Sequence, residues 1–465
     1  MEFVEYTIGE IAKSVRTGTT PTKTNKKFFD GEFLWVTPSD LKGQMFLKET
    51  EFTISKLAID SKQAFLYNKD TVLISTIGDI GKVSINRIPL ASNQQITGIE
   101  LKPEIILPEV FFYWVKLNKG LLQFKANKAI ISILTNKHLK KIKISFPRKI
   151  ADQQRIVSNL NSIQLLINNR INAIEVLRQL RRSFFFEMIG DPISNNFNHD
   201  WKFLGNKDFF KLSSGVTPLR SFSRFYDGNI PWLKSADVKN NFITSSEEFI
   251  SELALEKTSS KVYPINSILI AMYGQGKTKG SVGILKLEAS CNQACGVIYP
   301  NEWVKPIILF SQLLYSYDYI RSLGRGANRD NLSLNILQKL KILIPDNDVQ
   351  NRYEKVFTVT KIIENLFNEH LLLLQDLFDS YLLSSFEGKL GVKDEEYFED
   401  LIQTLSKEEL SQNNRMSILI DWVENNKFSN SEKYDIAFKH LMSLLEEGKV
   451  EQKNNRGKIK LTISE

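Results

Sequence analysis

Two long segments of the chain have apolar residues at alternating steps of three and four, the spacing of one face of an α-helix. The first segment, residues 151–188, contains no glycine or proline, and its apolar positions are Ile156, Leu160, Ile163, Ile167, Ile171, Ile174 and Leu177. Because the phase slips after Ile167, we predict a long helix with a coiled-coil seam and one stutter. At 1.5 Å per residue it spans on the order of 55 Å.

The second segment, residues 349–386, repeats the pattern without a slip, at Val356, Val359, Ile363, Leu366, His370, Leu373 and Leu377. Neither segment is apolar all round, so each predicted helix has one stripe that needs a partner. We expect the two helices to pair antiparallel, with His370 as a hydrogen-bonded register device in their seam. The predicted interface residues are Ile156, Leu160, Ile163, Ile167, Ile171, Ile174, Val356, Ile363, Leu366, His370, Leu373 and Leu377.

The segment before the first long helix has the pattern of short strands. Residues 33–36 and 71–75 are apolar and β-branched runs of strand length, and 77–81 reads as a turn into a strand at 82–86. Residues 108–124 have helical periodicity and begin at a proline, which favours the first turn of a helix. A last strand at 141–146 ends at Pro147. The pattern indicates an α+β domain.

The same scheme occurs twice. Thr20-Pro21, Phe29-Asp30-Gly31, Trp35 and Asp40 recur as Thr217-Pro218, Tyr226-Asp227-Gly228, Trp232 and Asp237, each about 197 residues later. Asn93-Gln94 recurs as Asn292-Gln293 after a two-residue insertion. A unit of this length must have its own core, so we predict two tandem α+β domains related by a pseudo-twofold axis and separated by the antiparallel helix pair.

The predicted boundaries follow from these repeats. They are 1–147 for the first domain, 148–190 for the first long helix, 191–345 for the second domain, 346–390 for the second long helix, and 391–465 for a C-terminal piece. That last piece has two helical segments and a hairpin pattern, the order of a small winged-helix-like domain. Because it is net acidic, we expect it to dock a protein rather than DNA.

Charge is distributed unevenly along the chain. Residues 391–465 carry 11 Lys+Arg and 15 Asp+Glu, so the first 390 residues carry +12 of a net +8. A basic excess on the duplicated part favours a polyanion partner. The two cysteines, Cys291 and Cys295, are too few for a disulfide framework and suggest a reducing, cytoplasmic setting. We expect no membrane span and no signal peptide.

No catalytic or metal-ligating set stands out. Ala271–Thr278 nearly matches a phosphate-binding loop, but a strand pattern follows it where that loop needs a helix. We therefore prefer a basic, glycine-rich loop that contacts DNA phosphates, with Lys277 and Lys279 as its cations. An ATP-binding enzyme that uses Lys277 stays an alternative, as does a protein-binding scaffold.

Side chains suited to reading bases gather in the predicted loops. Amides pair with adenine and guanidinium groups with guanine or phosphate, although Asn-Gln pairs at equivalent places in both copies also fit a turn required by the fold. The candidate DNA-binding residues are Thr19, Lys23, Lys26, Lys82, Asn93, Gln94, Lys128, Arg220, Arg224, Lys234, Gln275, Lys277, Lys279, Asn292, Gln293, Arg325, Asn328 and Arg329.

The passage from each domain into its long helix also recurs, with Phe146-Pro147, Gln153 and Ile156 in the first copy and Ile344-Pro345 and Gln350 in the second. Together with the repeats, these residues make the chain resemble the specificity subunit of type I restriction–modification systems. The resemblance covers about residues 5–390. It implies two target-recognition domains that each bind half of a split, asymmetric DNA sequence, and two long helices that set the gap between the halves. The first copy departs from the pattern at Ile133-Leu-Thr135, where the second has Asn331-Leu-Ser333.

The resemblance also implies partners and cofactors. Double-stranded DNA and two modification (methyltransferase) subunits would bind this chain, and restriction (motor-nuclease) subunits would join the full complex. S-adenosylmethionine, ATP and Mg²⁺ would belong to those partners, with no cofactor and no catalytic residue in this chain.

Overall fold

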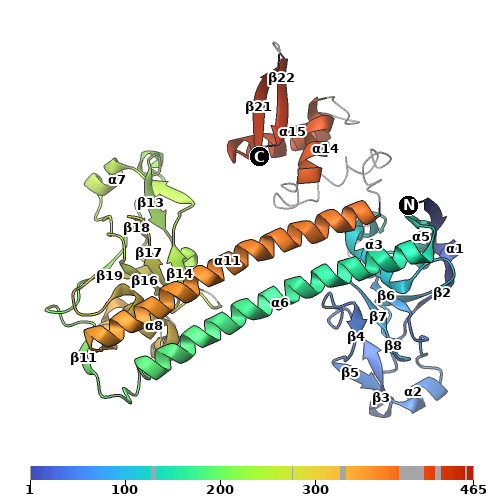
Figure 1. Cartoon of the computed structure of the whole chain (residues 1–465), viewed down its shortest axis with the longest axis horizontal. Helices are drawn as coiled ribbons and strands as arrows, with labels where there is room; N and C mark the ends of the chain where they lie inside the picture. Colours follow the sequence, from blue (N-terminus) through green and yellow to red (C-terminus); the bar gives the residue numbers. More distant parts are fainter. Residues whose placement is uncertain are drawn as a thin grey trace. The chain divides into compact units, whose positions relative to one another are not determined.

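The computed structural model describes residues 2–126, 132–274, 276–324, 331–386, 413–424, 431–455 and 458–463 (Figure 1). The chain forms two compact units. One comprises Met1–Ile167 with Leu373–Glu465, and the other comprises Asn168–Leu372. Each unit therefore contains one copy of the duplicated domain and opposite ends of the two long helices.

The first copy is built on a five-stranded sheet of order β2-β9-β6-β7-β4, beside a three-stranded sheet β5-β3-β8 and the pair β1-β10. Its strands are β1 (Phe3–Thr7), β2 (Ala12–Thr17), β3 (Phe29–Val36), β4 (Phe46–Leu47), β5 (Phe52–Ile54), β6 (Val72–Ser75), β7 (Val83–Asn86), β8 (Ala91–Ser92), β9 (Ile96–Leu101) and β10 (Lys143–Pro147). Its helices are α1 (Ile8–Ile11), η1 (Lys26–Phe28), α2 (Lys56–Asp60), α3 (Pro108–Leu117), α4 (Lys119–Phe124) and α5 (Asn136–Lys141).

The second copy repeats this topology strand for strand, as β12-β19-β16-β17-β14, β15-β13-β18 and β11-β20. Its strands are β11 (Asp200–Phe203), β12 (Leu212–Ser214), β13 (Ile230–Leu233), β14 (Asn241–Ile243), β15 (Glu248–Ile250), β16 (Ile268–Ala271), β17 (Val282–Leu285), β18 (Ser290–Cys291), β19 (Cys295–Ile298) and β20 (Lys341–Ile344). Its helices are η2 (Ser223–Phe225), η3 (Ser235–Asp237), α7 (Glu252–Lys257), α8 (Pro306–Tyr315), α9 (Tyr317–Leu323) and α10 (Leu334–Leu337). The duplication predicted from the sequence is thus a duplication of the fold.

The buried centre of each large sheet explains the β-branched runs. Every residue of β6 and β7, and of β16 and β17, is buried, and α3 and α8 pack on β7 and β17. The helix predicted at 108–124 is broken in two, which corrects that prediction. Asn118 ends α3, and its side-chain amide donates to the carbonyl of Trp114 at 2.9 Å.

Each copy is followed at once by a 39-residue helix, α6 (Ile150–Met188) and α11 (Asn347–Ser385), drawn in green and orange in Figure 1. A buried glutamine in the first turn ties each helix to its domain. Gln153 donates to the carbonyls of Ile105 and Pro147 and accepts from the amide of Leu107. Gln350 makes the corresponding three bonds, to Trp303, Pro345 and Lys305. The shared glutamine is therefore a structural residue.

Inside each unit the two helices contact one another antiparallel. In the first unit, Asn159 of α6 donates to the hydroxyl of Tyr381 of α11 at 2.6 Å. In the second, Phe185 near the end of α6 meets Tyr353 near the start of α11, with ring centroids 5.3 Å apart. Both of these aromatic side chains are fully buried in the core of the second copy.

The seam of α6 differs from the prediction at its centre. Ile156, Leu160, Ile167 and Ile174 are buried as expected and Ile163 is half-buried, but Ile171 is 47% exposed. Arg170 takes the seam position instead and lies over the ring of Phe367 of α11. With Arg170 in the seam, the steps of three and four continue through the helix without a stutter. The sequence pattern missed this position because it was drawn from apolar residues only, and Arg170 is a cation.

The seam of α11 lies one residue further along the chain than predicted. Its buried or half-buried residues are Tyr353, Phe357, Thr360, Glu364, Phe367, Leu371, Leu374, Phe378 and Leu382. The predicted positions Leu366, Leu373 and Leu377 are 49–65% exposed, while Val356 and Ile363 are half-buried. His370 is exposed as well, so it is not the register device. The apolar stripe that suggested this phase is a second face of the helix.

The C-terminal residues form α14 (Asn413–Glu424), α15 (Ser431–Glu446) and the antiparallel hairpin β21 (Val450–Asn455) with β22 (Lys458–Ile463). They share a small core that includes Leu419, Trp422, Leu441 and Leu444. Gly448, with φ +69°, follows α15 in the left-handed conformation expected of a helix C-cap. The winged-helix-like assignment and the docking role stay predictions. No helix among the described residues is long and apolar enough to cross a membrane.

Candidate nucleic-acid interface

The Thr-Pro loop that recurs in both copies is held against the turn that carries the Asn-Gln pair. In the first copy, the amides of Gly18 and Thr19 donate to the carbonyls of Ile96 and Ser92, each at 2.9 Å. Gly215 and Val216 make the same bonds in the second copy, to Cys295 and Cys291. A Cβ atom at either glycine would lie 2.1 Å from the facing strand, so only glycine allows this approach.

A tryptophan fixes the loop from its other side. The indole N–H of Trp35 donates to the carbonyl of Thr19 at 3.2 Å, and that of Trp232 donates to Val216 at 3.1 Å. The recurring aspartate closes the next turn. Asp40 accepts from the amide of Thr37 at 2.7 Å, and Asp237 accepts from Lys234 at the same distance. These shared residues build a framework and leave their neighbours free to vary.

The Asn-Gln pairs divide between the framework and the surface. Asn93 is buried, and its side chain bonds to the amide and side chain of Gln95 within its own turn. Asn292 is half-buried and accepts from the amide of Ala294. Gln94 and Gln293 are exposed, and each accepts from the recurring threonine hydroxyl of Thr20 or Thr217. The structure therefore corrects the prediction for Asn93, whose buried side chain is committed to a turn.

The second copy carries a charged cluster around its tryptophan. Arg220 lies over the rings of Tyr226 and Trp232, with 4.5 and 4.7 Å from its guanidinium carbon to the ring centroids. Its guanidinium also contacts Glu248 at 2.7 Å, and Lys234 contacts the other oxygen of that carboxylate at 2.6 Å. The hydrogen bond from Lys234, with the charge of Arg220 beside it, holds the pKa of Glu248 below its ordinary value. Glu248 is therefore an anion between two cations, and one of them, Arg220, lies on an aromatic platform formed by the rings of Tyr226 and Trp232.

The first copy keeps the platform but not the cluster. Trp35 packs between Phe29 and Phe52, with centroid distances of 6.0 and 6.4 Å. A shift of about 197 residues places Lys23 and Thr37 where the second copy has Arg220 and Lys234. The two copies thus present different polar groups on one scaffold.

The glycine-rich loop of the second copy follows β16 and leads into β17, which pairs antiparallel with β16. The loop therefore runs from strand to strand, the order that its sequence predicted, whereas a phosphate-binding loop leads into a helix. Lys277 is exposed, and its carbonyl accepts from the hydroxyl of Tyr317 at 2.6 Å. Lys279 is only 5% exposed, so the predicted phosphate contact by its side chain is wrong. Arg321 binds the carbonyl of Lys279 at 2.9 Å and anchors the loop to α9.

The other candidate residues fall into three groups. Lys23, Lys26 and Arg224 are exposed, as is Thr19, whose hydroxyl donates to the carbonyl of Gln63. Lys82 is paired with Asp79 at 3.2 Å. The predictions that fall outside the described residues are Lys128, Gln275, Arg325, Asn328 and Arg329.

Sequence reasoning missed Glu248 of β15 and Arg321 of α9, whose side chains contact these loops. Glu248 lies on β15, 28 residues after Arg220, and only the fold brings them together. The candidate residues were chosen mainly as hydrogen-bond donors, so Glu248 was left out, although a carboxylate can accept a hydrogen bond from cytosine. In the described part of the chain, no cluster of three His, Cys, Asp or Glu side chains has the arrangement of a metal site.

Residues 1–176 and 198–370 match the family model of the type I restriction modification DNA specificity domain. The chain belongs to this family. Two matched segments, each built on the same sheet topology, show that it contains two tandem DNA specificity domains of type I restriction–modification systems.

Curated members of the family are similar over most or half of the chain. The type I restriction enzyme MjaIX specificity subunit of Methanocaldococcus jannaschii is 23% identical over 425 residues, which cover 84% of this chain and 97% of that protein. The EcoR124I/EcoR124II specificity subunit of Escherichia coli is 27% identical over 46% of this chain and 50% of that protein.

Two solved structures share the fold. The S subunit of the type I system from M. genitalium superposes with a TM-score of 0.53 at 16% identity, covering 82% of this chain and 95% of that one. A chain from a study of complex assembly and conformational transition of the type I system gives 0.54 at 16% identity, covering 83% and 98%.

Proposed function

We propose that this chain is the DNA specificity subunit of a type I restriction–modification complex, acting on DNA in the cytoplasm. Each domain binds one half of a bipartite, asymmetric target. The chain itself makes and breaks no covalent bond, and it directs the chemistry of subunits that it recruits.

The observation that carries this proposal is one framework with two sets of polar groups. The Thr-Pro loop, the tryptophan and the aspartate turn are bonded alike in both copies. Around them, the second copy has Arg220, Lys234 and Glu248 where the first has Lys23, Thr37 and Phe52, which pairs with Trp35 as Glu248 pairs with Trp232. Different donors and acceptors on the same scaffold suit two half-sites of different sequence.

The long helices suit the role of a spacer. Each has 39 residues, about 58 Å at the α-helical rise, and each begins within three residues of the last strand of its domain. The glutamine anchors Gln153 and Gln350 fix how each helix leaves its domain. Helix length then sets the number of base pairs between the two half-sites.

The same helices offer a surface for other subunits. On α11, one apolar face is outside the seam, and its side chains are 49–65% exposed: Val359, Ile362, Leu366, Leu372, Leu373 and Leu377. Two methyltransferase subunits that bind here would bring S-adenosylmethionine, and restriction subunits that join them would bring ATP and Mg²⁺. An apolar face of this size on a helix favours a protein partner.

Methylome sequencing of a host with and without this chain tests the proposal directly. We expect a split, asymmetric adenine-methylated motif to appear only when the chain and its methyltransferase partner are present. Duplex binding by the assembled complex should also weaken steeply with ionic strength. A methylome that does not change, together with salt-insensitive binding, would instead favour a scaffold for polypeptides.

A further inference from the structure

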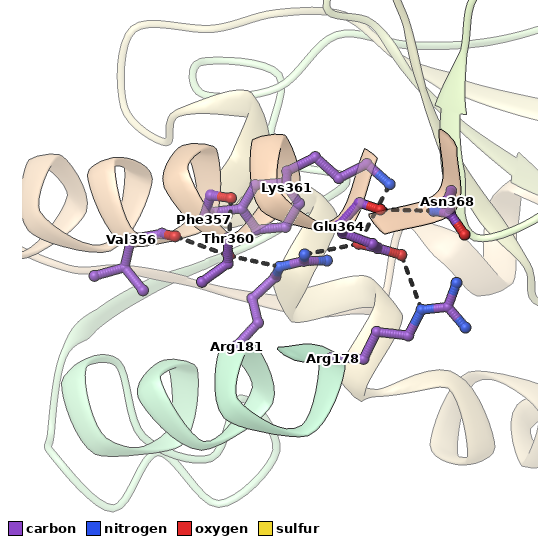
Figure 2. A network of polar contacts seen from close by, with 8 residues as sticks. All are labelled: Arg178, Arg181, Val356, Phe357, Thr360, Lys361, Glu364 and Asn368. Carbon is purple, nitrogen blue, oxygen red and sulfur yellow. Dashed lines mark hydrogen bonds and ion pairs between the residues drawn. The ribbon is translucent and has the colours of Figure 1, made fainter. Parts of the chain in front are cut away.

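The seam between α6 and α11 contains a charged layer in the second unit (Figure 2). The Arg181 guanidinium donates to Glu364 at 2.7 Å and to the hydroxyl of Thr360 at 3.0 Å. Arg178 donates to the other oxygen of Glu364 at 2.9 Å, and Lys361 lies 3.5 Å away. Glu364 and Arg181 are 3% and 7% exposed, so both charges are buried and each depends on the other.

The duplication supplies a counterpart for this layer at the other end of the helices. Helix α6 begins at Ile150 and α11 at Asn347, a shift of 197 residues. By that shift, Arg181 corresponds to Phe378 and Glu364 corresponds to Ile167. Both counterparts lie in the first unit, and each is 6% exposed. One end of the seam is therefore ionic, and the equivalent end is apolar.

We propose that this asymmetry makes each long helix select the other helix of the duplication and reject a second copy of itself. Helices that descend from one ancestor have similar seams, so an antiparallel pair of two α6 helices, or of two α11 helices, from different chains is the natural competitor. The charged layer discriminates against that competitor. This inference does not depend on the DNA-binding function.

The cost to a same-helix pair follows from the residues that would meet. In a pair of α6 helices, Arg181 would face Ile167 at both ends. In a pair of α11 helices, Glu364 would face Phe378 at both ends. A pair of α6 helices thus buries two Arg181 cations without a carboxylate, and a pair of α11 helices buries two Glu364 carboxylates that keep only the contact with Lys361 of their own helix at 3.5 Å. Removing the main partner of a buried charge is strongly destabilising. Only the pair of α6 with α11 places the carboxylate against the arginine.

A polar group in a helical seam is a known means of choosing partner and register, at some cost in stability. The expected part played by His370 is thus taken by Arg181 and Glu364. The discrimination rests on Arg181 and Glu364, because the Arg178 side chain is 53% exposed and Lys361 contacts Glu364 of its own helix.

The test removes the asymmetry by copying the apolar layer onto the charged one. The five replacements give the second unit residues that the first unit already packs: Arg178→Gln, Arg181→Phe, Thr360→Ile, Lys361→Gln and Glu364→Ile. Because the combination comes from the chain itself, this transplant variant should fold.

Pairing is read out in the full-length chain with two added cysteines, Arg170→Cys and Phe367→Cys. These positions face one another in the parent and are related by the same shift of 197 residues. Chains are refolded together from urea and treated with a short bis-maleimide, and the joined peptides are identified by mass spectrometry. Native Cys291 and Cys295 are buried and serve as an internal check that the fold is intact.

With the charged layer present, we expect cross-links between positions 170 and 367 and only background amounts of 170–170 and 367–367. In the transplant variant, the same-helix cross-links should rise at least about tenfold. Glu364→Gln, which keeps the shape of the side chain, should give an intermediate rise. Same-helix products that stay at background in both variants would overturn the proposal. So would a transplant variant that fails to fold, because the layer would then be needed for folding and not for choosing a partner.

Discussion

The guanidinium of Arg170 lies 4.1 Å above the ring centre of Phe367, and the two residues occupy the same position in the duplicated sequence, 197 residues apart. Arg170 therefore contacts its own counterpart in the duplication. In an antiparallel pair of duplicated helices, this happens only at the point where exchanging the two helices leaves the pair unchanged. In a pair of identical helices this point would bring together two arginines or two phenylalanines. The cation–aromatic contact is available only because the two copies have diverged.

The stability of the helix pair should depend on pH through Glu364. Burial raises the pKa of this carboxyl, but hydrogen bonds from Arg181 and Arg178 outweigh burial and hold it below the ordinary value of 4.5. A group with a lowered folded-state pKa stabilises the protein above its unfolded pKa, and that contribution disappears as the pH falls through the folded pKa. The parent should therefore lose stability relative to Glu364→Gln as the pH falls below about 4.5.

Urea unfolding of the full chain between pH 7 and pH 3 measures this difference. Exposed Glu369 on the same helix provides the control, since Glu369→Gln should track the parent at every pH. A free-energy gap between the parent and Glu364→Gln that is the same at pH 7 and pH 3.5 would show that the carboxylate contributes nothing through its charge.

The paired glutamines should be equally costly to remove. Replacing Gln153 or Gln350 with leucine leaves one backbone amide and two carbonyls without their bonds. Each unsatisfied buried group costs about 1–3 kcal/mol, so we expect each variant to lose several kcal/mol in chemical denaturation. Gln154→Leu, one residue away and exposed, is the matched control and should have little effect. A loss at Gln153 without one at Gln350 would contradict their equivalence.

The repeats were enough to predict the architecture, because each recurring residue serves the framework. Gly18 and Gly215, Trp35 and Trp232, and the two glutamines make bonds that any copy of this fold needs. The first copy has Thr135 where the second has Ser333, but this difference in sequence changes the framework little. The hydroxyl of Thr135 caps α5 as that of Ser333 caps α10.

The helix seam was harder to predict, and polar residues explain why. On α11 the apolar residues form two faces, and counting them favoured the exposed one. The true seam passes through Thr360 and Glu364, which look like surface residues until their partners Arg181 and Arg178 are placed. No local pattern shows that a carboxylate 183 residues from an arginine will be buried against it.

The charged cluster should control one half-site only. Glu248→Gln removes the anion that binds both Lys234 and Arg220, the cation that lies over the ring of Trp232. We expect methylome sequencing to show relaxed or altered specificity in one half of the motif, with about 1–3 kcal/mol of lost discrimination at a base pair and no change in the other half or in the spacer. Neighbouring Glu247→Gln is the control, because that side chain is exposed and outside the cluster. Equal loss in both halves would indicate damage to folding.

The exposed face of α11 should be required for binding methyltransferase subunits. Leu373 is 65% exposed, so Leu373→Lys removes apolar area from the surface without opening the core. We expect normal thermal stability of the isolated chain and a weaker complex, by roughly tenfold, from losing one buried leucine contact. Gln375→Lys adds the same charge on the same helix at an exposed position and should bind normally. Equal binding by both variants would place the partner on another surface.

Lengthening both long helices should lengthen the spacer of the recognised DNA. Seven residues inserted after Arg170 and seven after Phe367 preserve the three-four seam and leave the layers at both ends intact. The added length is about 10 Å, close to three base pairs at 3.4 Å each. The methylated motif should keep both half-sites and gain about three unspecified base pairs between them. Insertion into α6 alone puts the seams out of register, separating Arg181 from Glu364, and should abolish methylation instead of changing the spacer. If the matched insertions leave an active complex with the original spacer, helix length does not set the distance between the half-sites.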